Sequence, residues 1–383
     1  GFAPLPNPRG INLLGGVVTT MISAIDWRGR TTKDLAVLEL DERSSRLLFP
    51  HIHPDLLLCT NLFRDSFKRN AHSEFIFDIL DQNIPSTTKL VLNGDDLISA
   101  RLAPKNERVY FGVLPQEGEE MTEDNRIQDM PLCPYCGAPL RFEFRRYHHI
   151  GRASCTRCDF ASPELDYAVT AVHPETGRLD MTLGDKKTDL KMVGPSVTDT
   201  YNLAAAAALL SEFGLTDIQI RRSVEKLQIV KSRYQEIDIG GKHVILSVAK
   251  GQNPVACSRV FDFIRRYEGR KAVVLMVDDL GDAKSTSENI SWLYDADFEF
   301  LREDSITQIV CSGVRNLDYR VRLLVAGIAP DRITCVRQEA DAASAVDLDK
   351  ADTIFFLYDV YTVSHAKTAE SVLRARLETK EGE

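Results

Sequence analysis

Four cysteines in the middle of the chain have the spacing of a metal site. Cys133 and Cys136 form one C-x-x-C pair, and Cys155 and Cys158 form a second pair after eighteen intervening residues. Two such pairs at this separation predict a structural zinc, because four thiolates at about 2.3 Å complete its tetrahedral shell. A closed shell leaves no position for water, so we expect the metal to fold the segment rather than to catalyse. A redox dithiol or a disulfide pair is the alternative.

The residues around these cysteines are typical of a zinc ribbon, which we place at about 130–162. Gly137 fits the tight turn after the first pair, and residues 140–144 alternate like a β-strand. His148 and His149 could each replace a cysteine ligand. Since four cysteines suffice, we expect both histidines on the surface.

Length, charge and composition narrow the possible classes of protein. The chain has 383 residues, enough for two or three domains, and is 44% hydrophobic and 27% charged, as globular proteins are. A net charge of −9 argues against a non-specific nucleic-acid binder, which is usually basic. No stretch approaches the roughly 20 apolar residues of a membrane span, and no signal peptide is visible. We expect a cytoplasmic protein whose remaining cysteines are small buried hydrophobes: Cys59, Cys257, Cys311 and Cys335.

The first part of the chain predicts a parallel sheet. Short apolar runs at 35–40, 55–59 and 89–92 alternate with helical segments such as 11–25, as in a sheet buried on both faces. Polar residues past the ends of such strands line the ligand crevice. Three acids in these positions suit a Mg²⁺–phosphate site if they converge. These acids are Glu39, Asp65 and Asp95.

The segments on either side of the ribbon complete this first domain. We expect a further hairpin between residues 99 and 128, and two antiparallel strands at 166–172 and 178–183. Two helices are expected to follow, at 201–210 and at about 217–228.

From about residue 229 the pattern of strands and helices restarts. Apolar runs separated by helical segments predict a second, Rossmann-like α/β domain that ends in a polar amphipathic helix at 364–379. The strands are expected at 243–248, 272–277, 308–311 and 353–357. The predicted architecture is therefore α/β, with domains at 1–228 and 229–383 and the ribbon inserted in the first.

Six motifs occur in an order that resembles one enzyme family. They are Glu-Leu-Asp-Glu at 39–42, Thr-Asn-Leu-Phe-Arg-Asp at 60–65, Asn-Gly-Asp-Asp at 93–96, the ribbon, Tyr-Asn-Leu-Ala-Ala at 201–205 and Ser-Trp-Leu-Tyr-Asp-Ala-Asp-Phe-Glu at 291–299. In this order they resemble the MurT family, the Mur-ligase-like subunits of lipid II isoglutaminyl synthase. The resemblance covers essentially the whole chain, and the ribbon and the 291–299 run are specific to this branch of the Mur ligases.

The resemblance implies an ATP-dependent carbon–nitrogen ligase of peptidoglycan biosynthesis with glutamine as its amido donor. The D-glutamate α-carboxylate of the lipid II stem peptide would be amidated through an acyl phosphate that ammonia displaces. A separate glutaminase subunit, GatD, would supply the ammonia, and both subunits would act at the inner face of the cell membrane. Such chemistry needs Mg²⁺ and cationic side chains, because a carboxylate is a poor electrophile until it is phosphorylated.

The resemblance also implies catalytic roles for three residues. Glu39 matches the glutamate that holds Mg²⁺ in Mur ligases, and Asp65 follows it in the next strand-end motif. Asn289 stands where the family has an acid that completes a Cys-His-acid triad across the GatD interface. Because an asparagine can also orient an imidazole, our hypothesis is that Asn289 keeps this role.

Four further residues match positions that contact the nucleotide in the family. Asn202 is implied to read adenine, and Arg233 to reach the phosphates. Lys250 and Asn253 match a Lys-Asn-Pro motif that opens the C-terminal domain over the nucleotide.

The chain departs from the family pattern at several positions. It contains no G-x-x-x-x-G-K-[ST] motif, which Mur ligases place upstream of the residues matching 10–13. We therefore expect the first domain to be N-terminally incomplete and ATP binding by this chain to be poor. Ser66 and Lys68 replace the usual Gln and Asp, and Lys-Asn-Pro is expanded to five residues at 250–254. The alternatives are a non-catalytic zinc-ribbon scaffold subunit, or another Mur-type ligase such as a cyanophycin- or folylpolyglutamate-like enzyme.

Overall fold

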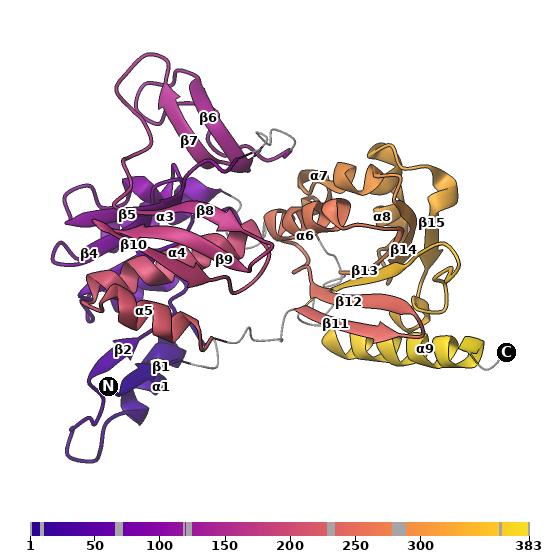
Figure 1. The fold of residues 1–383 in the computed structure, drawn as a ribbon, viewed down its shortest axis with the longest axis horizontal. Helices are drawn as coiled ribbons and strands as arrows, with labels where there is room; N and C mark the ends of the chain where they lie inside the picture. The colour runs from indigo at the N-terminus through magenta and orange to yellow at the C-terminus, as the bar shows by residue number, and fades with distance from the viewer. Residues whose placement is uncertain are drawn as a thin grey trace. The chain divides into compact units, whose positions relative to one another are not determined.

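The computed structural model divides into two compact units (Figure 1). The first unit comprises Gly1–Leu62, His72–Thr122 and Asp129–Leu227, and the second Phe63–Ala71, Glu123–Gln128 and Gln228–Glu383. Two short segments from the first half of the chain thus belong to the second unit by their contacts. The structure describes residues 2–7, 11–65, 72–117, 119, 125–227, 234–277, 289–359 and 362–381.

A six-stranded sheet with the order β10-β9-β8-β5-β4-β3 forms the centre of the first unit. Its strands are β3 (Leu56–Cys59), β4 (Lys89–Asn93), β5 (Arg108–Val113), β8 (Tyr167–His173), β9 (Arg178–Leu183) and β10 (Lys186–Lys191). The first four are parallel and the last two continue the sheet antiparallel, which confirms the predicted strands at 55–59 and 89–92 and the predicted antiparallel pair. Among the described residues of 99–128 the one strand is β5, which pairs in parallel between β4 and β8, so no hairpin is found there.

The strand predicted at 35–40 lies outside this sheet. There β2 (Leu35–Val37) pairs in parallel only with β1 (Pro4–Pro6), in a separate two-stranded sheet beside α1 (Leu14–Ser23). The side chains of Ala36 and Val37 are exposed, so this strand lacks the burial on both faces that the apolar run suggested.

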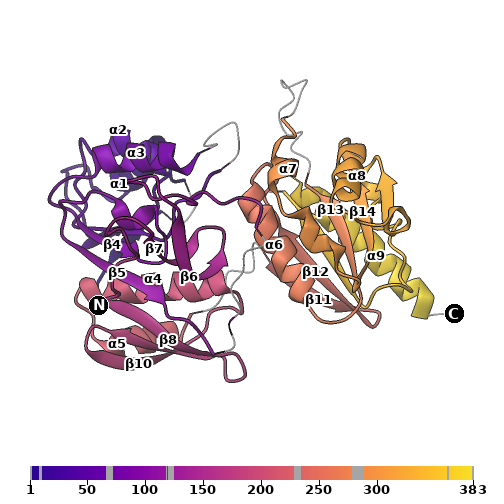
Figure 2. The same ribbon diagram turned by 90° about the horizontal axis from the view of Figure 1, so that it is seen from above.

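Helices cover the sheet of the first unit. The α-helices after α1 are α2 (Ser45–Leu48), α3 (Ser73–Asn83), α4 (Val197–Glu212) and α5 (Asp217–Val224). Four alanines on α4 are buried, which lets this helix pack closely on β4 and β5 (Figure 2). Ser196 and Asp199 form a capping box that fixes where α4 begins.

The ribbon is a two-stranded antiparallel hairpin, β6 (Leu140–Tyr147) and β7 (Ile150–Cys155). Its turn contains His148 in the left-handed region, at φ +49°. Strand β6 begins within the alternating segment that the sequence predicted, and it extends three residues further.

A second six-stranded sheet, with the order β11-β12-β16-β13-β14-β15, forms the centre of the second unit. Its strands are β11 (Tyr234–Ile239), β12 (Lys242–Val248), β13 (Lys271–Met276), β14 (Ile306–Ser312), β15 (Ile333–Val336) and β16 (Thr353–Tyr358). All pairs are parallel except β11 with β12. The four predicted strands are confirmed, and the two strands that were not predicted lie at the edges of the sheet.

Helices cover both faces of this sheet. Three of them, α6 (Pro254–Arg266), α7 (Trp292–Asp295) and α8 (Asn316–Val325), share one apolar core, and α9 (Val363–Glu381) packs into the core on the other face. Short 3₁₀ turns lie at Glu42–Ser44, Ser99–Arg101, Phe298–Arg302, Pro330–Arg332 and Glu339–Asp341. Within the described part of the chain, no helix has the length and hydropathy to span a membrane.

Candidate functional site

The four ribbon cysteines lie together in a geometry that fits one metal ion. Their sulfur atoms are all within 4.8 Å of one another. The Sγ–Sγ distance is 3.6 Å between Cys133 and Cys158 and 3.4 Å between Cys136 and Cys155. Thiolates bound tetrahedrally to zinc lie about 3.8 Å apart, whereas a disulfide joins sulfurs at about 2.05 Å. The cluster therefore fits a metal better than a disulfide pair, and it is the one such group of His, Cys, Asp or Glu among the described residues.

Backbone N–H groups around this cluster favour thiolates. The N–H of Ala138 lowers the pKa of Cys136 to about 6. Burial raises the pKa of Cys133, but the N–H groups of Tyr135 and Cys136 outweigh it, so that this pKa is also lowered. Gly137 adopts φ +69° in the turn and donates its N–H to the carbonyl of Cys133 at 2.9 Å. The N–H of Phe160 lowers the pKa of Cys158, but burial and hydrogen bonds with the other three sulfurs outweigh it and raise this pKa to about 12. The loop of the first pair therefore favours the deprotonated sulfur that binds metal.

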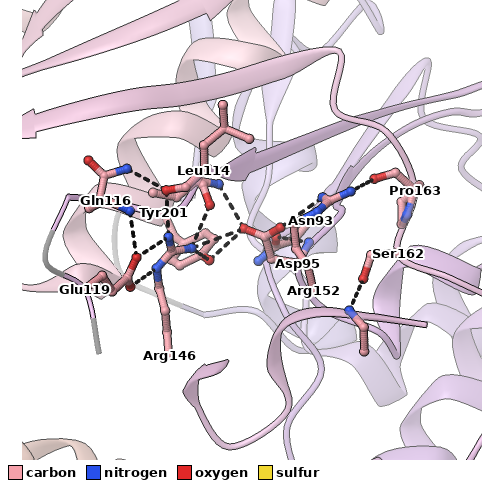
Figure 3. A network of polar contacts seen from close by, with 12 residues as sticks. Asn93, Asp95, Leu114, Gln116, Glu119, Arg146, Arg152, Ser162, Pro163 and Tyr201 are labelled. Atoms are coloured by element: carbon pink, nitrogen blue, oxygen red, sulfur yellow. Dashed lines mark hydrogen bonds and ion pairs between the residues drawn. The ribbon is translucent and has the colours of Figure 1, made fainter. Parts of the chain in front are cut away.

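A buried ion network fixes the ribbon to the sheet of the first unit (Figure 3). Asp95, which follows β4, is fully buried and accepts hydrogen bonds from the N–H of Val113 at 2.9 Å and from Tyr201 Oη at 2.7 Å. The guanidinium groups of Arg146 and Arg152, on β6 and β7, lie 3.5 and 3.4 Å from its two carboxylate oxygens. Burial raises the pKa of Asp95, although these partners oppose the shift.

Arg146 is the second centre of this network. Its side chain is 3% exposed and donates to the carbonyls of Val113 at 2.7 Å and Leu114 at 2.8 Å, and to Tyr201 Oη at 2.6 Å. It also pairs with the carboxylate of Glu119 at 2.5 Å. Because a buried guanidinium needs every donor engaged, this residue joins the hairpin, the sheet and α4 in one unit.

Asp96 anchors the turn of the hairpin in the same way. Its carboxylate accepts from the N–H of Leu62 at 2.6 Å and lies 3.1 Å from Nε2 of His149. The bridge between Asp96 and Ile150 folds the hairpin turn back onto the sheet. Both His148 and His149 are consequently only 1% exposed, so the prediction of surface histidines was wrong.

One of the three strand-end acids expected at a magnesium site, Asp95, is engaged by other partners. Asp95 is enclosed by its arginine and tyrosine partners, Glu39 belongs to the first unit and Asp65 to the second. No three acids at metal-binding distance are found in the part of the chain that the structure describes. Asp95 therefore anchors the ribbon and does not line an open magnesium site.

The two other predicted residues of the first unit are solvent-exposed. Glu39 follows β2, and its Oε1 accepts from Nδ2 of Asn12 at 3.1 Å. Asn7 exchanges two hydrogen bonds of 2.9 Å with the backbone of Glu39, which fixes the position of this residue. Asn202 lies on the exposed side of α4. Both side chains are accessible to a ligand.

In the second unit the structure brings three predicted residues together. Nδ2 of Asn253 donates to Oδ1 of Asp65 at 2.9 Å, and Nζ of Lys250 lies 3.6 Å from the same oxygen. Asn253 also caps α6, because its Oδ1 accepts the N–H of Ala256 at 2.9 Å. A lysine and a helix N-terminus favour a negatively charged group, and here the carboxylate of Asp65 takes that place.

The expanded loop at 250–254 has a steric reason for its extra glycine. A Cβ at Gly251 would lie 2.3 Å from the carbonyl oxygen of Val277 and 3.2 Å from Oδ2 of Asp359. The loop is therefore pressed against the carboxyl ends of β13 and β16, where ligands of open α/β sheets bind. Lys250 and Gln252 adopt φ +47° and +63°, a strain that clusters at functional sites.

Residues 291–299 form hydrogen bonds and ion pairs with residues of two segments from the first half of the chain, Phe63–Ala71 and Glu123–Gln128. Asp297, which is 1% exposed, accepts from Nδ2 of Asn125 at 2.8 Å and from the N–H of Arg126 at 2.6 Å. Glu299 pairs with Arg126 at 3.1 Å, and Asp295 lies 3.5 Å from Arg64. Sequence reasoning did not find these roles, since the only signal was three acids at alternate positions of the run.

Asn289 lies just before α7 and is exposed. Its Oδ1 accepts the N–H of Ser291 at 2.9 Å, so its side chain is oriented by the turn. Arg233, Ser66 and Lys68 lie outside the described residues.

Comparisons with known proteins agree with the sequence motifs. A family model described as MurT ligase C-terminal matches residues 251–363. The MurT subunit of lipid II isoglutaminyl synthase (glutamine-hydrolyzing) from Streptococcus pneumoniae is 30% identical over 335 residues, which cover 86% of this chain and 72% of that protein.

Solved structures share the fold of this chain. A pseudomurein peptide ligase type C from Methanothermus fervidus matches with a TM-score of 0.68 and 18% identity, over 90% of this chain and 70% of that one. MurF from Acinetobacter baumannii matches with a TM-score of 0.62 and 14% identity, over 98% of this chain and 71% of that one. The predicted Mur-ligase-like α/β fold is thus confirmed.

Proposed function

This chain belongs to the MurT family of lipid II isoglutaminyl synthase subunits, and from that premise we propose that it is the synthetase subunit of such an enzyme. The reaction is amidation of the D-glutamate α-carboxylate in the lipid II stem peptide. The carboxylate takes the γ-phosphoryl group of ATP, which releases ADP, and ammonia then displaces phosphate to form the amide. A GatD-like glutaminase subunit supplies the ammonia from glutamine.

The cluster of Lys250, Asn253 and Asp65 is the observation that carries the proposal. The two residues matching the nucleotide motif lie at the N-terminus of α6, on a strained loop at the carboxyl edge of the sheet. Lys250 is half exposed, so its ammonium can leave Asp65 for a phosphate. Asp65, from the strand-end motif of the first half of the chain, lies in this cluster, which fits its assignment to the same site.

Each remaining residue has a role that follows from its chemistry. Glu39 offers an accessible carboxylate for Mg²⁺, which when bound neutralises charge on the transferred phosphoryl group. Asn202 offers an amide for adenine, and Arg233 a guanidinium for phosphate. Asn289 offers an oriented amide oxygen to an imidazole of the partner subunit. The reaction would take place in the cytoplasm, at the membrane face where lipid II is presented.

The ribbon would hold a structural zinc in this scheme. Its four sulfurs fit a closed tetrahedral shell, and its hairpin is locked to the sheet through Asp95 and Arg146. Metal binding there would stabilise the first unit without taking part in the reaction.

Reconstitution tests the proposal. The complete reading frame is co-expressed with the glutaminase subunit of the same organism, and ADP release is measured with lipid II, ATP and glutamine. We expect ADP release to require all three, and ammonium salts to replace glutamine. Complex formation without ADP release would favour the scaffold alternative. ADP release that depends on an added amino acid instead would favour another Mur-type ligase.

A further inference from the structure

Two cysteines are paired on neighbouring strands at one edge of the second sheet. Cys311 on β14 and Cys335 on β15 are register partners in this parallel pair, and both are free thiols. Neighbouring strands lie about 4.8 Å apart, which is within the range of about 4.4–6.8 Å between the Cα atoms of a disulfide. The spacing of the backbone therefore permits a bond between the two sulfurs.

The side chains of both cysteines lie on the same face of the sheet. Cys311 belongs to the apolar core that α6, α7 and α8 share, and Cys335 packs against the same core. The next residues along the two strands, Val310 and Val336, pack in the core on the opposite face. Because side chains alternate along a strand, the two sulfurs share one face. They lie on the side that is covered by α8, which contacts both strands (Figure 1).

The two thiols differ in their access to solvent. Cys311 is fully buried, whereas Cys335 is half-buried, as is every residue of β15. Strand β15 stands at the end of the strand order, so among the described residues no further strand covers its outer side. A small oxidant can therefore reach Cys335 more readily than Cys311.

The surroundings of Cys335 favour its thiolate. The thiol of Cys311 lowers the pKa of Cys335 to about 7 against the effect of burial, and the guanidinium of Arg320 adds to the lowering. In return, Cys335 and burial raise the pKa of Cys311, so the buried sulfur keeps its proton. An accessible thiolate beside a second thiol is the arrangement found in redox-sensitive cysteines.

We propose that Cys335 and Cys311 form a reversible redox pair that reacts with hydroperoxides, with Cys335 as the nucleophile and Cys311 as the resolving thiol. The Cys335 thiolate attacks the terminal oxygen of the hydroperoxide, which forms an S–O bond and breaks the O–O bond. The alkoxide that leaves takes up a proton and becomes an alcohol, while the sulfur, oxidised by two electrons, becomes a sulfenic acid.

The resolving step forms the disulfide. Cys311 gives up its proton and attacks the sulfenic sulfur of Cys335, so that an S–S bond replaces the S–O bond. The displaced hydroxide and the proton from Cys311 leave together as water. A dithiol reductant returns both residues to thiols by thiol–disulfide exchange.

This disulfide would tie the edge strand to the sheet. The loop that it closes runs from Cys311 to Cys335 and contains the whole of α8. In the reduced protein, the thiol of Cys335 donates to the carbonyl of Asn316, at the start of α8, at 3.7 Å. The disulfide removes this contact, because it has no S–H proton. Neither cysteine has a role in the proposed function, so the pair would act independently of it.

Peptide mapping of the oxidised protein tests this redox pair. The protein from the complete reading frame is treated with hydrogen peroxide, unfolded in iodoacetamide to block free thiols, and digested with trypsin. The digest places Cys311 and Cys335 on separate peptides, 303–315 and 333–337. We expect mass spectrometry to find these two peptides linked by a disulfide, and dithiothreitol to separate them. Cys257 is an internal control that should stay a thiol, because it is fully buried in the same core.

Two variants separate the roles of the two cysteines. In Cys311→Ser, Cys335 should still react and should be trapped as its sulfenic acid by a cyclic 1,3-diketone. In Cys335→Ser, Cys311 should remain a thiol, because its proton and its burial protect it. The matched control Cys257→Ser should form the disulfide to the same extent as the parent.

The linkage in the parent protein is decisive by itself, since it needs no substitution. If peptides 303–315 and 333–337 stay unlinked while peroxide oxidises other cysteines, the inference is wrong. Oxidation of Cys311 in Cys335→Ser to the same extent as in the parent would overturn the assigned roles. Either result would leave the proposed function in place.

Discussion

Asp65 and Asn253 are 188 residues apart in the sequence, yet Oδ1 of Asp65 accepts a 2.9 Å hydrogen bond from Nδ2 of Asn253. The strand-end acid of the first half of the chain thus lies beside the Lys-Asn loop of the second half. Lys250 contacts the same oxygen at 3.6 Å. This relationship connects two motifs that the sequence could only place in order.

Removing the charge at Lys250 tests this cluster directly. In the complex made from the complete reading frame, we expect Lys250→Met to raise the KM for ATP by more than about tenfold, because the ammonium is the flexible cation at the N-terminus of α6. Glutamine hydrolysis by the partner subunit should stay unchanged, since that reaction needs no nucleotide phosphate. Steady-state kinetics of both half-reactions in the complex measure the difference. An unchanged KM for ATP would remove Lys250 from the site.

The ribbon cysteines should bind equimolar zinc. We expect Cys136→Ser and Cys155→Ser to lose zinc and to lower the thermal unfolding temperature, because the metal closes a segment with little core of its own. The matched control is Cys335→Ser, whose sulfur lies outside the cluster and which should keep its zinc. Elemental analysis measures the zinc content of each variant, and calorimetry measures its unfolding temperature. Full zinc content in the ribbon variants would refute the site.

Asp95 should be essential for stability. In Asp95→Asn the buried guanidinium of Arg146 loses a carboxylate partner, and breaking a buried pair costs about 3–5 kcal/mol. Asp78→Asn on the exposed side of α3 should change the free energy of unfolding by less than about 0.5 kcal/mol. Chemical denaturation of both variants measures the two effects. Equal effects would show that the network does not anchor the ribbon.

The pair of Glu299 and Arg322 predicts a pH-dependent contribution to stability. Burial raises the pKa of Glu299, but the 2.7 Å bond from Arg322 outweighs it and holds the pKa below its usual range. A carboxyl with a lowered pKa in the folded state stabilises above the unfolded value of about 4.3, and this contribution is lost as the pH falls through the folded pKa. We therefore expect Glu299→Gln to be destabilised at neutral pH.

This deficit should shrink as the pH falls below about 4. Denaturation of the parent chain and of Glu299→Gln at several pH values measures the trend. A difference that stays constant from neutral to acid pH would show that the carboxylate charge is not the cause.

Local patterns predicted much of the fold, and tertiary contacts explain what they missed. The zinc ribbon and the buried strands could be predicted because the cysteine spacing and the apolar runs are visible in short stretches of sequence. The burial of His149 depends instead on Asp96, 53 residues away, and no periodicity reports such a contact. The strands β11 and β15 were missed because polar residues interrupt both, β11 at Gln235, Glu236 and Asp238 and the four-residue β15 at Thr334.

In the candidate site, too, residues in sequence motifs were predicted and residues defined by distant contacts were not. Lys250 and Asn253 were found through a motif, and the structure adds Gly251, which the close approach of the Val277 carbonyl requires. Asp95 was expected at a magnesium site, because a strand-end acid looks the same in sequence whether it meets a metal or an arginine. The role of Asp297 could not be predicted from the sequence, because its partners Asn125 and Arg126 lie about 170 residues earlier.

The mass of the lipid II stem peptide after incubation with the reconstituted complex tests the central claim most directly. The reaction contains ATP, Mg²⁺ and isotopically labelled glutamine, and the complex is made from the complete reading frame, either as the parent or with the substitution Lys250→Met. We predict that the parent complex replaces one hydroxyl of the D-glutamate α-carboxyl by a labelled amino group, and that the variant does so much more slowly. An intact complex that hydrolyses glutamine but leaves the stem peptide unamidated would contradict a synthetase role for this chain.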